Sequence, residues 1–253
     1  MGVGDVFRPF DADAPQPRRN LKTAEIVALE IVQDIVEQHL KPGARLPHEP
    51  EMLAQYRVSR SSLREALRLL ETQGLIAIRP GAGAGTVVGK ATSSNLGRMM
   101  TLHFHMADVT YDDLLSSWML TEPLLAERAA SNPDRDLVRE KMEPYCQGQD
   151  RHPRRDIASG HAFHDAVADL SGNRALAMTL SSIGFIVSDH ILMMKDRKGL
   201  EDFIVHDHSD LAEAIIEGDP VKARQLMAEH VLHVADDFRA FWPRRVGQRV
   251  IWR

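Results

Sequence analysis

The stretch "VSRSSLREALRLLETQGLI" (residues 58–76) decides the fold of the N-terminal part of this chain. Its apolar residues recur at the spacing of one buried helix face: Leu63, Ala66, Leu67 and Leu70. Three arginines lie one helical turn apart on another side: Arg60, Arg64 and Arg68. We therefore predict a helix from about Ser59 to Gln73, capped by Gly74, that carries a positively charged face.

The flanking segments add the other elements of a small domain. Residues 23–40 have apolar residues at helical spacing, and a following "KPG" ends that helix. A short helix over about 50–56 comes next, with Pro50 tolerated in its first turn. "LIAIR" (75–79) and "TVV" (86–88) predict two short strands around the glycine-rich turn "PGAGAG". Two helices, a tight turn, a third helix and a β-hairpin make a winged helix-turn-helix.

This arrangement predicts that the protein binds double-stranded DNA. The second helix of a helix-turn-helix enters the major groove, where an arginine can make two bonds to guanine, and serines at the helix start can contact phosphates. The candidate DNA-binding residues are Arg45, Arg57, Ser59, Arg60, Ser61, Ser62, Arg64, Arg68, Arg79, Gly81 and Gly83. We interpret the glycines as a wing tip, because a phosphate-binding loop would need a Gly-Lys-Ser/Thr ending and a dinucleotide fingerprint would need a following helix.

The charge of the chain differs between its two parts. Residues 1–90 hold 12 Lys and Arg against 11 Asp and Glu, whereas the remainder holds 19 against 25, within a net charge of −5. Arginines on one face of a near-neutral segment favour a local anion-binding surface, and a solvated helix face is the alternative. With one cysteine (Cys146), no apolar run of roughly 18 residues and no export signal, we expect a cytoplasmic protein.

We divide the chain into five parts. They are a flexible N-terminal arm (1–20), the winged helix-turn-helix (21–89), a small, polar, unpatterned linker (90–97), an all-helical domain (98–242) and a basic, aromatic tail (243–253). Short loops between amphipathic helices in the fourth part predict an antiparallel bundle. The expected fold class is therefore mainly α, with one small β-hairpin as the wing.

Histidines are concentrated in the helical part. Ten of the 12 follow residue 100, and six of these form three groups: His161 with His164, His206 with His208, and His230 with His233. Neutral imidazole is the commonest metal ligand, and a helical bundle can gather ligands from facing helices. The groups therefore favour a functional pocket, although a single histidine is ordinarily a surface or core residue.

Residues 46–88, "LPHEPEMLAQYRVSRSSLREALRLLETQGLIAIRPGAGAGTVV", closely resemble the DNA-binding domain of the GntR family of bacterial transcription regulators. The resemblance implies that Arg60 and Arg64 contact bases or phosphates and that the serines at the helix start contact the DNA backbone. Pro50 stands where the family usually has an arginine. One DNA contact is therefore lost, and the operator sequence cannot be assumed to be the usual one.

Three helical motifs resemble the effector-binding domain of the FadR branch of that family: "WMLTEPLLAERAA", "FHDAVADLSGNRAL" and "HSDLAEAIIEGDPVKARQLMAEH". In many such domains three histidines and an aspartate bind a divalent metal, which would here use His164, His208 and His230. Gly160 stands at the aspartate position, so three histidines and a water are left to hold zinc, nickel or manganese. The sequence leaves open whether a metal binds.

A second departure concerns the effector. The candidate effector pocket consists of Trp118, Glu122, His161, Asn173 and Met193. Trp118 stands where the family has an arginine that grips the ligand, and this loss removes the natural clamp for an organic acid. We therefore expect an effector that is larger and less anionic than a simple carboxylate, while ordinary core packing is the alternative role for the methionine.

These patterns predict a ligand-responsive transcription regulator, by default a repressor, that binds a near-palindromic operator as a homodimer. A small-molecule effector in the helical domain would shift the arrangement of the two winged domains. The alternative is a helical, metal-dependent phosphohydrolase that uses His206 and Asp207. We favour the regulator, because a histidine–aspartate dipeptide is a weak signal and leaves a fused winged helix unexplained.

Overall fold

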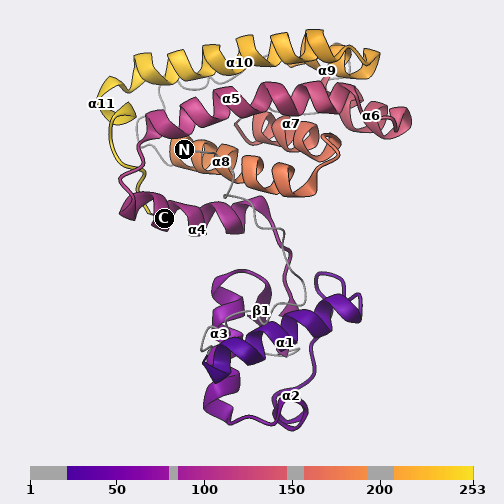
Figure 1. Ribbon diagram of the computed structural model, residues 1–253, viewed down its shortest axis with the longest axis vertical. Helices are drawn as coiled ribbons and strands as arrows, with labels where there is room; N and C mark the ends of the chain where they lie inside the picture. The colour runs from indigo at the N-terminus through magenta and orange to yellow at the C-terminus, as the bar shows by residue number, and fades with distance from the viewer. Residues whose placement is uncertain (1–21, 80–84, 147–156, 193–207, 253) are drawn as a thin grey trace, which may run out of the picture. The chain divides into compact units, whose positions relative to one another are not determined.

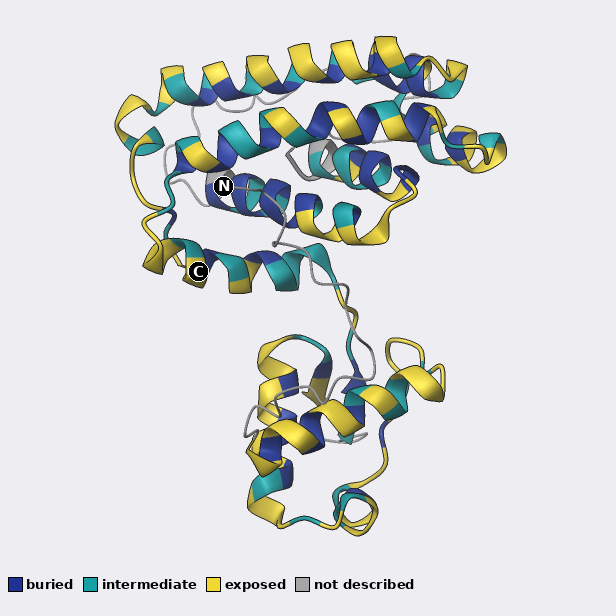
Figure 2. Ribbon diagram, viewed as in Figure 1, coloured by how far each residue is buried: buried dark blue, intermediate teal, exposed yellow. Residues whose placement is uncertain are grey.

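The computed structural model describes residues 22–79, 85–146, 157–192 and 208–252 (Figure 1). The chain forms two compact units, Met1–Lys90 and Ala91–Arg253. Each unit has a hydrophobic core of its own, which Figure 2 shows as buried positions on the facing sides of the helices.

The first unit is a winged helix-turn-helix, as the sequence predicts. Its elements are α1 (Thr23–Glu37), α2 (Glu49–Tyr56), α3 (Arg60–Thr72), β1 (Ile76–Arg79) and β2 (Gly85–Val88). The two strands pair antiparallel, with Ile76 opposite Val88. The apolar face of α3 is buried and packs against α1, so the amphipathic spacing that predicted this helix also fixes which face it presents outward.

A short extended segment adds a third line of pairing to the wing. Leu46 N donates to Thr86 O (2.9 Å), and Val88 N donates to Ala44 O (2.8 Å). Arg45 lies opposite Val87 in an antiparallel bridge. The segment before α2 therefore pairs with the edge of β2 that faces away from β1. This pairing places Arg45 beside the wing.

The second unit is helical in its described ranges. Its elements are α4 (Ser93–Met106), α5 (Tyr111–Ala130), α6 (Arg135–Met142), the 3-10 helix η1 (Glu143–Tyr145), α7 (Ile157–Leu170), α8 (Arg174–Leu192), α9 (Ser209–Glu217), α10 (Pro220–Phe241) and α11 (Pro243–Val246). Helix α10 packs along α5, α5 packs on α7 and α8, and α4 packs on α8 (Figure 1). The mainly α fold class is confirmed.

Helix α4 begins earlier than the sequence suggested. The predicted linker covered residues 90–97, but α4 starts at Ser93, so only residues 89–92 separate it from β2. The Thr92 side chain accepts a hydrogen bond from Asn95 N (3.2 Å) and caps the helix. A threonine cap without an acidic residue three positions later is a weak sequence signal, which is why this start was missed.

The C-terminal tail packs against the corner between α4 and α5. Val250 N donates to Val109 O (2.8 Å), and Tyr111 N donates to Gln248 O (3.1 Å). The ring Nδ1 of His105, near the end of α4, lies 2.9 Å from Val250 O. Since the Val250 side chain is fully buried, the tail completes the core at this end of the bundle.

Candidate functional site

Helix α3 carries the basic face that the sequence predicted. Ser59 begins the helix by accepting a hydrogen bond from Ser62 N (3.2 Å), and its hydroxyl also lies 2.8 Å from that of Ser61. Arg60, Arg64 and Arg68 are all exposed in the described structure. A row of exposed guanidinium groups suits the negative walls of a DNA groove.

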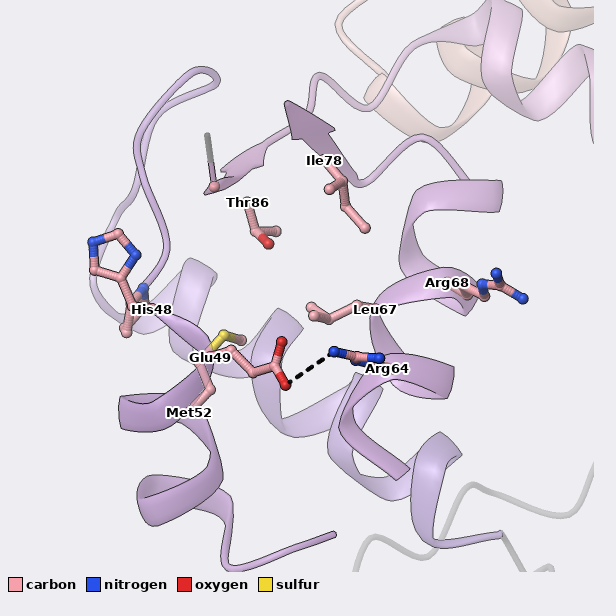
Figure 3. Close-up of a pocket in the computed structure, with 10 residues that line it drawn as sticks. His48, Glu49, Met52, Arg64, Leu67, Arg68, Ile78 and Thr86 are labelled. Carbon is pink, nitrogen blue, oxygen red and sulfur yellow. Dashed lines mark ion pairs between the residues drawn. The ribbon is translucent and has the colours of Figure 1, made fainter. Parts of the chain in front are cut away.

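A groove of about 450 Å³ lies beside this face (Figure 3). The start of α2, one side of α3 and the two strands of the wing line it: Pro47, His48, Glu49, Met52, Arg64, Leu67, Arg68, Ile78, Gly85 and Thr86. Across it, Arg64 Nη2 forms an ion pair with Glu49 Oε1 at 3.7 Å. This ion pair joins α3 to α2, whereas Figure 3 shows Arg68 directed away from Glu49.

The remaining candidate DNA-binding residues lie around the same unit. Arg45, Arg57 and Arg79 are exposed, and Arg57 has a left-handed backbone (φ 53°) at the turn before α3. Gly81 and Gly83 fall outside the residues that the structure describes. The described candidates thus come from α3, the turn before it and the wing, the parts with which a winged helix contacts DNA.

In the second unit, the structure brings together one histidine from each of the three predicted groups. His164 lies on α7, His208 immediately precedes α9, and His230 lies on α10. One nitrogen from each falls within 4.8 Å of the other two. The Nε2 atoms of His164 and His230 are 3.2 Å apart, and the three rings are in mutual contact.

Glu122 on α5 orients this cluster. Its side chain is buried, and its Oε2 lies 2.8 Å from Nδ1 of His164. If Nδ1–H donates to the carboxylate, Nε2 of His164 is unprotonated and presents a lone pair to the cluster. Glu122 was predicted as a pocket residue, and its geometry is that of the carboxylate that supports a metal-binding histidine.

The donor set fits a divalent metal ion. Two nitrogen ligands of a tetrahedral zinc ion lie about 3.3 Å apart, given zinc–nitrogen bonds of about 2.0–2.1 Å. The observed 3.2 Å between the Nε2 atoms of His164 and His230 matches that spacing. Gly160, one turn before His164 on α7, adds no carboxylate. The three imidazoles therefore leave a fourth position for water or a ligand oxygen.

Trp118 and His161 lie next to the cluster. The ring centroids of Trp118 and His164 are 5.3 Å apart. His161 Nε2 lies 3.5 Å from Asp165 Oδ2. Burial lowers the pKa of His161, against the opposing charge of Asp165, so this imidazole is neutral at pH 7. Trp118 and His161 thus make the surroundings of the cluster aromatic, and neither of these two side chains carries a positive charge.

Other predicted site residues lie elsewhere. Asn173 is exposed, and its Oδ1 accepts a hydrogen bond from Leu176 N (3.0 Å), so it caps the start of α8. His233 is exposed and pairs with Asp237 (3.3 Å). Met193, His206 and Asp207 lie outside the described residues. No described contact joins Asn173 to the histidine cluster.

Two residues near these sites were missed by sequence reasoning. Glu49 lies 15 positions before the arginine that it holds, and such a pairing leaves no periodic signal. Gly184 on α8 lies beside Trp118 and His161, where an added Cβ would be 3.8–3.9 Å from their rings. A glycine inside an apolar helical pattern is the signal that could have drawn attention to this position.

Comparison with known proteins identifies both units. Residues 23–86 match the family described as "Bacterial regulatory proteins, gntR family", and residues 113–233 match the "FCD domain". The chain belongs to the GntR family of bacterial regulatory proteins. This GntR protein combines the family's helix-turn-helix with a FadR-type C-terminal domain, as the sequence resemblance implied.

Similar proteins cover nearly the whole chain. The chain is 25% identical over 272 residues to "HTH-type transcriptional repressor NanR" of Escherichia coli (strain K12), covering 95% of this chain and 97% of that protein. The same values hold for NanR of Shigella flexneri. The solved structure "Streptococcus agalactiae GntR" is 27% identical, with a TM-score of 0.54, and the match covers 84% of this chain and 99% of that chain.

These comparisons decide between the two predicted functions. The family and the similar proteins are transcription regulators, not enzymes, so this GntR protein is a DNA-binding transcription regulator. The phosphohydrolase alternative has no support from them. Within the described ranges, none of the helices has the length and apolar character needed to cross a membrane.

Proposed function

We propose that this GntR protein is a ligand-controlled repressor that acts in the cytoplasm as a homodimer on a near-palindromic operator. The observation that carries the proposal is the pairing of two features in one chain. One unit presents an exposed row of arginines on α3, and the other encloses a histidine cluster supported by a buried carboxylate. The similar NanR proteins are named as repressors, which supports this direction of control.

On the DNA side, the proposal assigns Arg60, Arg64 and Arg68 to the major groove. Two-fold symmetry would let two copies of α3 meet half-sites about one turn apart. Glu49 would favour the orientation in which Arg64 enters the groove, since the two side chains form an ion pair between α2 and α3. Ser61 and Ser62, at the exposed start of α3, would contact phosphates.

On the effector side, His164, His208 and His230 would hold a divalent ion such as zinc, nickel or manganese. Such an ion would supply an open coordination position for an oxygen of the effector. Glu122 would keep the imidazole of His164 in the tautomer that binds metal. An effector bound here changes DNA affinity only if it prefers one arrangement of the dimer over the other.

The DNA half is tested by fluorescence anisotropy with DNA from the protein's own promoter and with a scrambled duplex. We expect specific binding that weakens steeply with salt. Arg64→Ala should abolish the preference for the promoter DNA. Arg224→Ala is the matched control, because Arg224 is similarly exposed (60% against 69%) but lies on α10. Equal binding of both duplexes by the wild type would refute operator recognition.

The metal half is tested by elemental analysis of the purified, tag-free protein. We expect about one zinc, nickel or manganese ion per chain, and its loss in His208→Ala. His233→Ala is the control, because His233 lies one turn after His230 on the same helix but is 67% exposed. Metal retained in His208→Ala, or absent from the wild type after dialysis against zinc, would refute the site.

A further inference from the structure

A buried hydrogen-bond donor without a partner lies beside the histidine cluster. The Trp118 side chain is 93% buried, since its relative exposure is 7%. Its indole Nε1 is inaccessible to solvent and makes no hydrogen bond in the described structure. Buried indole N–H groups usually find a partner, because leaving one unpaired is costly. The unsatisfied donor therefore points to a ligand that is absent from the structure.

At Gly184 on α8 there is room for a methyl group next to this donor. A Cβ at position 184 would lie 3.9 Å from Trp118 Nε1 and 3.8 Å from His161 Cε1, which is ordinary contact. Gly97 on α4 is different, because its Cβ would meet Phe185 at 2.9 Å and Ser182 O at 3.0 Å. Packing thus requires a glycine at 97 but not at 184. A glycine inside a helix reduces its stability relative to alanine, so the space at 184 calls for another explanation.

The charges around the donor favour an uncharged partner. Glu122 lies one turn after Trp118 on α5, is buried and contacts His164. Asp165 lies 3.5 Å from His161, whose imidazole burial keeps neutral. A carboxylate placed against Trp118 would have a single neutral donor to compensate its desolvation, with the buried Glu122 one turn further along α5. A carbonyl, amide or hydroxyl oxygen accepts the same hydrogen bond without that cost.

We propose that Trp118 Nε1 donates a hydrogen bond to an uncharged oxygen of the effector, in the space beside Gly184, and so selects a hydroxylated or amide-bearing ligand tail over a carboxylate tail. The inference rests on the proposed function for the placement of the effector at the histidine cluster. Trp118 is then a specificity-determining residue. The ligand has one anionic head at the histidines and an uncharged polar tail at Trp118.

The test uses three probes with the same 2-hydroxycarboxylate head: D-gluconate with a hydroxylated tail, 2-hydroxyglutarate with a carboxylate tail, and 2-hydroxyhexanoate with an apolar tail. Calorimetry measures their binding to the zinc-loaded full chain. Trp118→Phe removes the N–H and keeps an aromatic ring, and Trp252→Phe is the control, since Trp252 is 62% exposed. Gly184→Ala adds a methyl group beside the donor.

We expect the wild type to bind D-gluconate most tightly. Trp118→Phe should weaken D-gluconate about fivefold, the effect of one lost hydrogen bond, and leave 2-hydroxyhexanoate unchanged. Gly184→Ala should also weaken D-gluconate, yet raise the melting temperature by roughly 1–4 °C through its better helix propensity. Higher stability with lower affinity distinguishes a filled ligand space from a damaged fold.

Three results would overturn the inference: tightest binding of 2-hydroxyglutarate, equal D-gluconate affinity of Trp118→Phe and Trp252→Phe, or no binding of any probe. These readouts are separate from DNA recognition. If the wild type binds the probes as expected but shows no preference for promoter DNA, the proposed function fails while the assignment of Trp118 stands.

Discussion

Val250 gives a quantitative test of the role of the C-terminal tail. Its side chain is fully buried against the corner of α4 and α5, although Val250 lies only two residues before Trp252, the last residue that the structure describes. Val250→Ala removes two methyl groups and leaves the backbone bonds of Val250 to Val109 and His105 in place. The substitution therefore isolates the contribution of the buried side chain.

The expected loss of stability follows from that burial. Two buried carbon groups contribute about 1.6 kcal/mol at about 0.8 kcal/mol each. The cavity that remains, on the order of 50 Å³, adds up to about 1.2 kcal/mol if the site does not collapse. We expect a decrease in the free energy of unfolding of about 1.6–2.8 kcal/mol. For a slope near 2 kcal/mol per molar, the urea midpoint falls by roughly 1 M.

Tryptophan fluorescence during urea unfolding measures this loss in the second unit alone. The chain has three tryptophans, at 118, 242 and 252, and all lie after residue 90. Arg244→Ala is the control, because Arg244 is exposed in α11 and should change stability by no more than about 0.5 kcal/mol. If the Val250→Ala and Arg244→Ala midpoints coincide, the tail is not part of the core and the reasoning is refuted.

Three further substitutions test other parts of the molecule. Glu122→Gln should weaken zinc binding about 10- to 100-fold in a chelator competition, since it removes the carboxylate that supports His164; unchanged affinity would contradict this role. Glu49→Gln removes the charge that pairs with Arg64. We expect this to cost about 1 kcal/mol of discrimination between the two duplexes, so the ratio of promoter to scrambled DNA affinity should fall about fivefold. Tyr56→Phe should cost about 1 kcal/mol at pH 7, measured by circular dichroism, because Tyr56 donates to Asp34 (2.5 Å).

The helices were predictable because their signals are local. The apolar spacing along 63–70 predicted both the existence of α3 and its buried face, and the structure confirms both. The histidine groups placed candidates on three separate segments of a bundle, and the family resemblance selected His164, His208 and His230 among them. The packing of α7, α9 and α10 on α5 brings these three together. Periodicity specifies a face, and a small bundle leaves few ways for such faces to meet.

The features that the sequence did not predict depend on contacts between distant positions. Val250 is buried by a segment about 140 residues earlier in the chain, so its own neighbours carry no sign of it. The unpaired state of Trp118 Nε1 is a property of everything around it. Gly184 was visible as a glycine in a helical pattern, but only the measured space beside it separates it from Gly97, where packing excludes a side chain.

The two departures from the family pattern act on the effector in the same direction. With Gly160 in place of an aspartate, a divalent ion held by three neutral imidazoles keeps one more positive charge than it would with a carboxylate ligand, which favours an anionic ligand head. With Trp118 in place of an arginine, the position beside His164 loses a positive charge and presents a neutral donor. Under the proposed function, both changes would leave the metal ion as the positive charge that the ligand meets. A ligand with one anionic head bound at the histidines and an uncharged polar group at Trp118 is the one that this distribution fits.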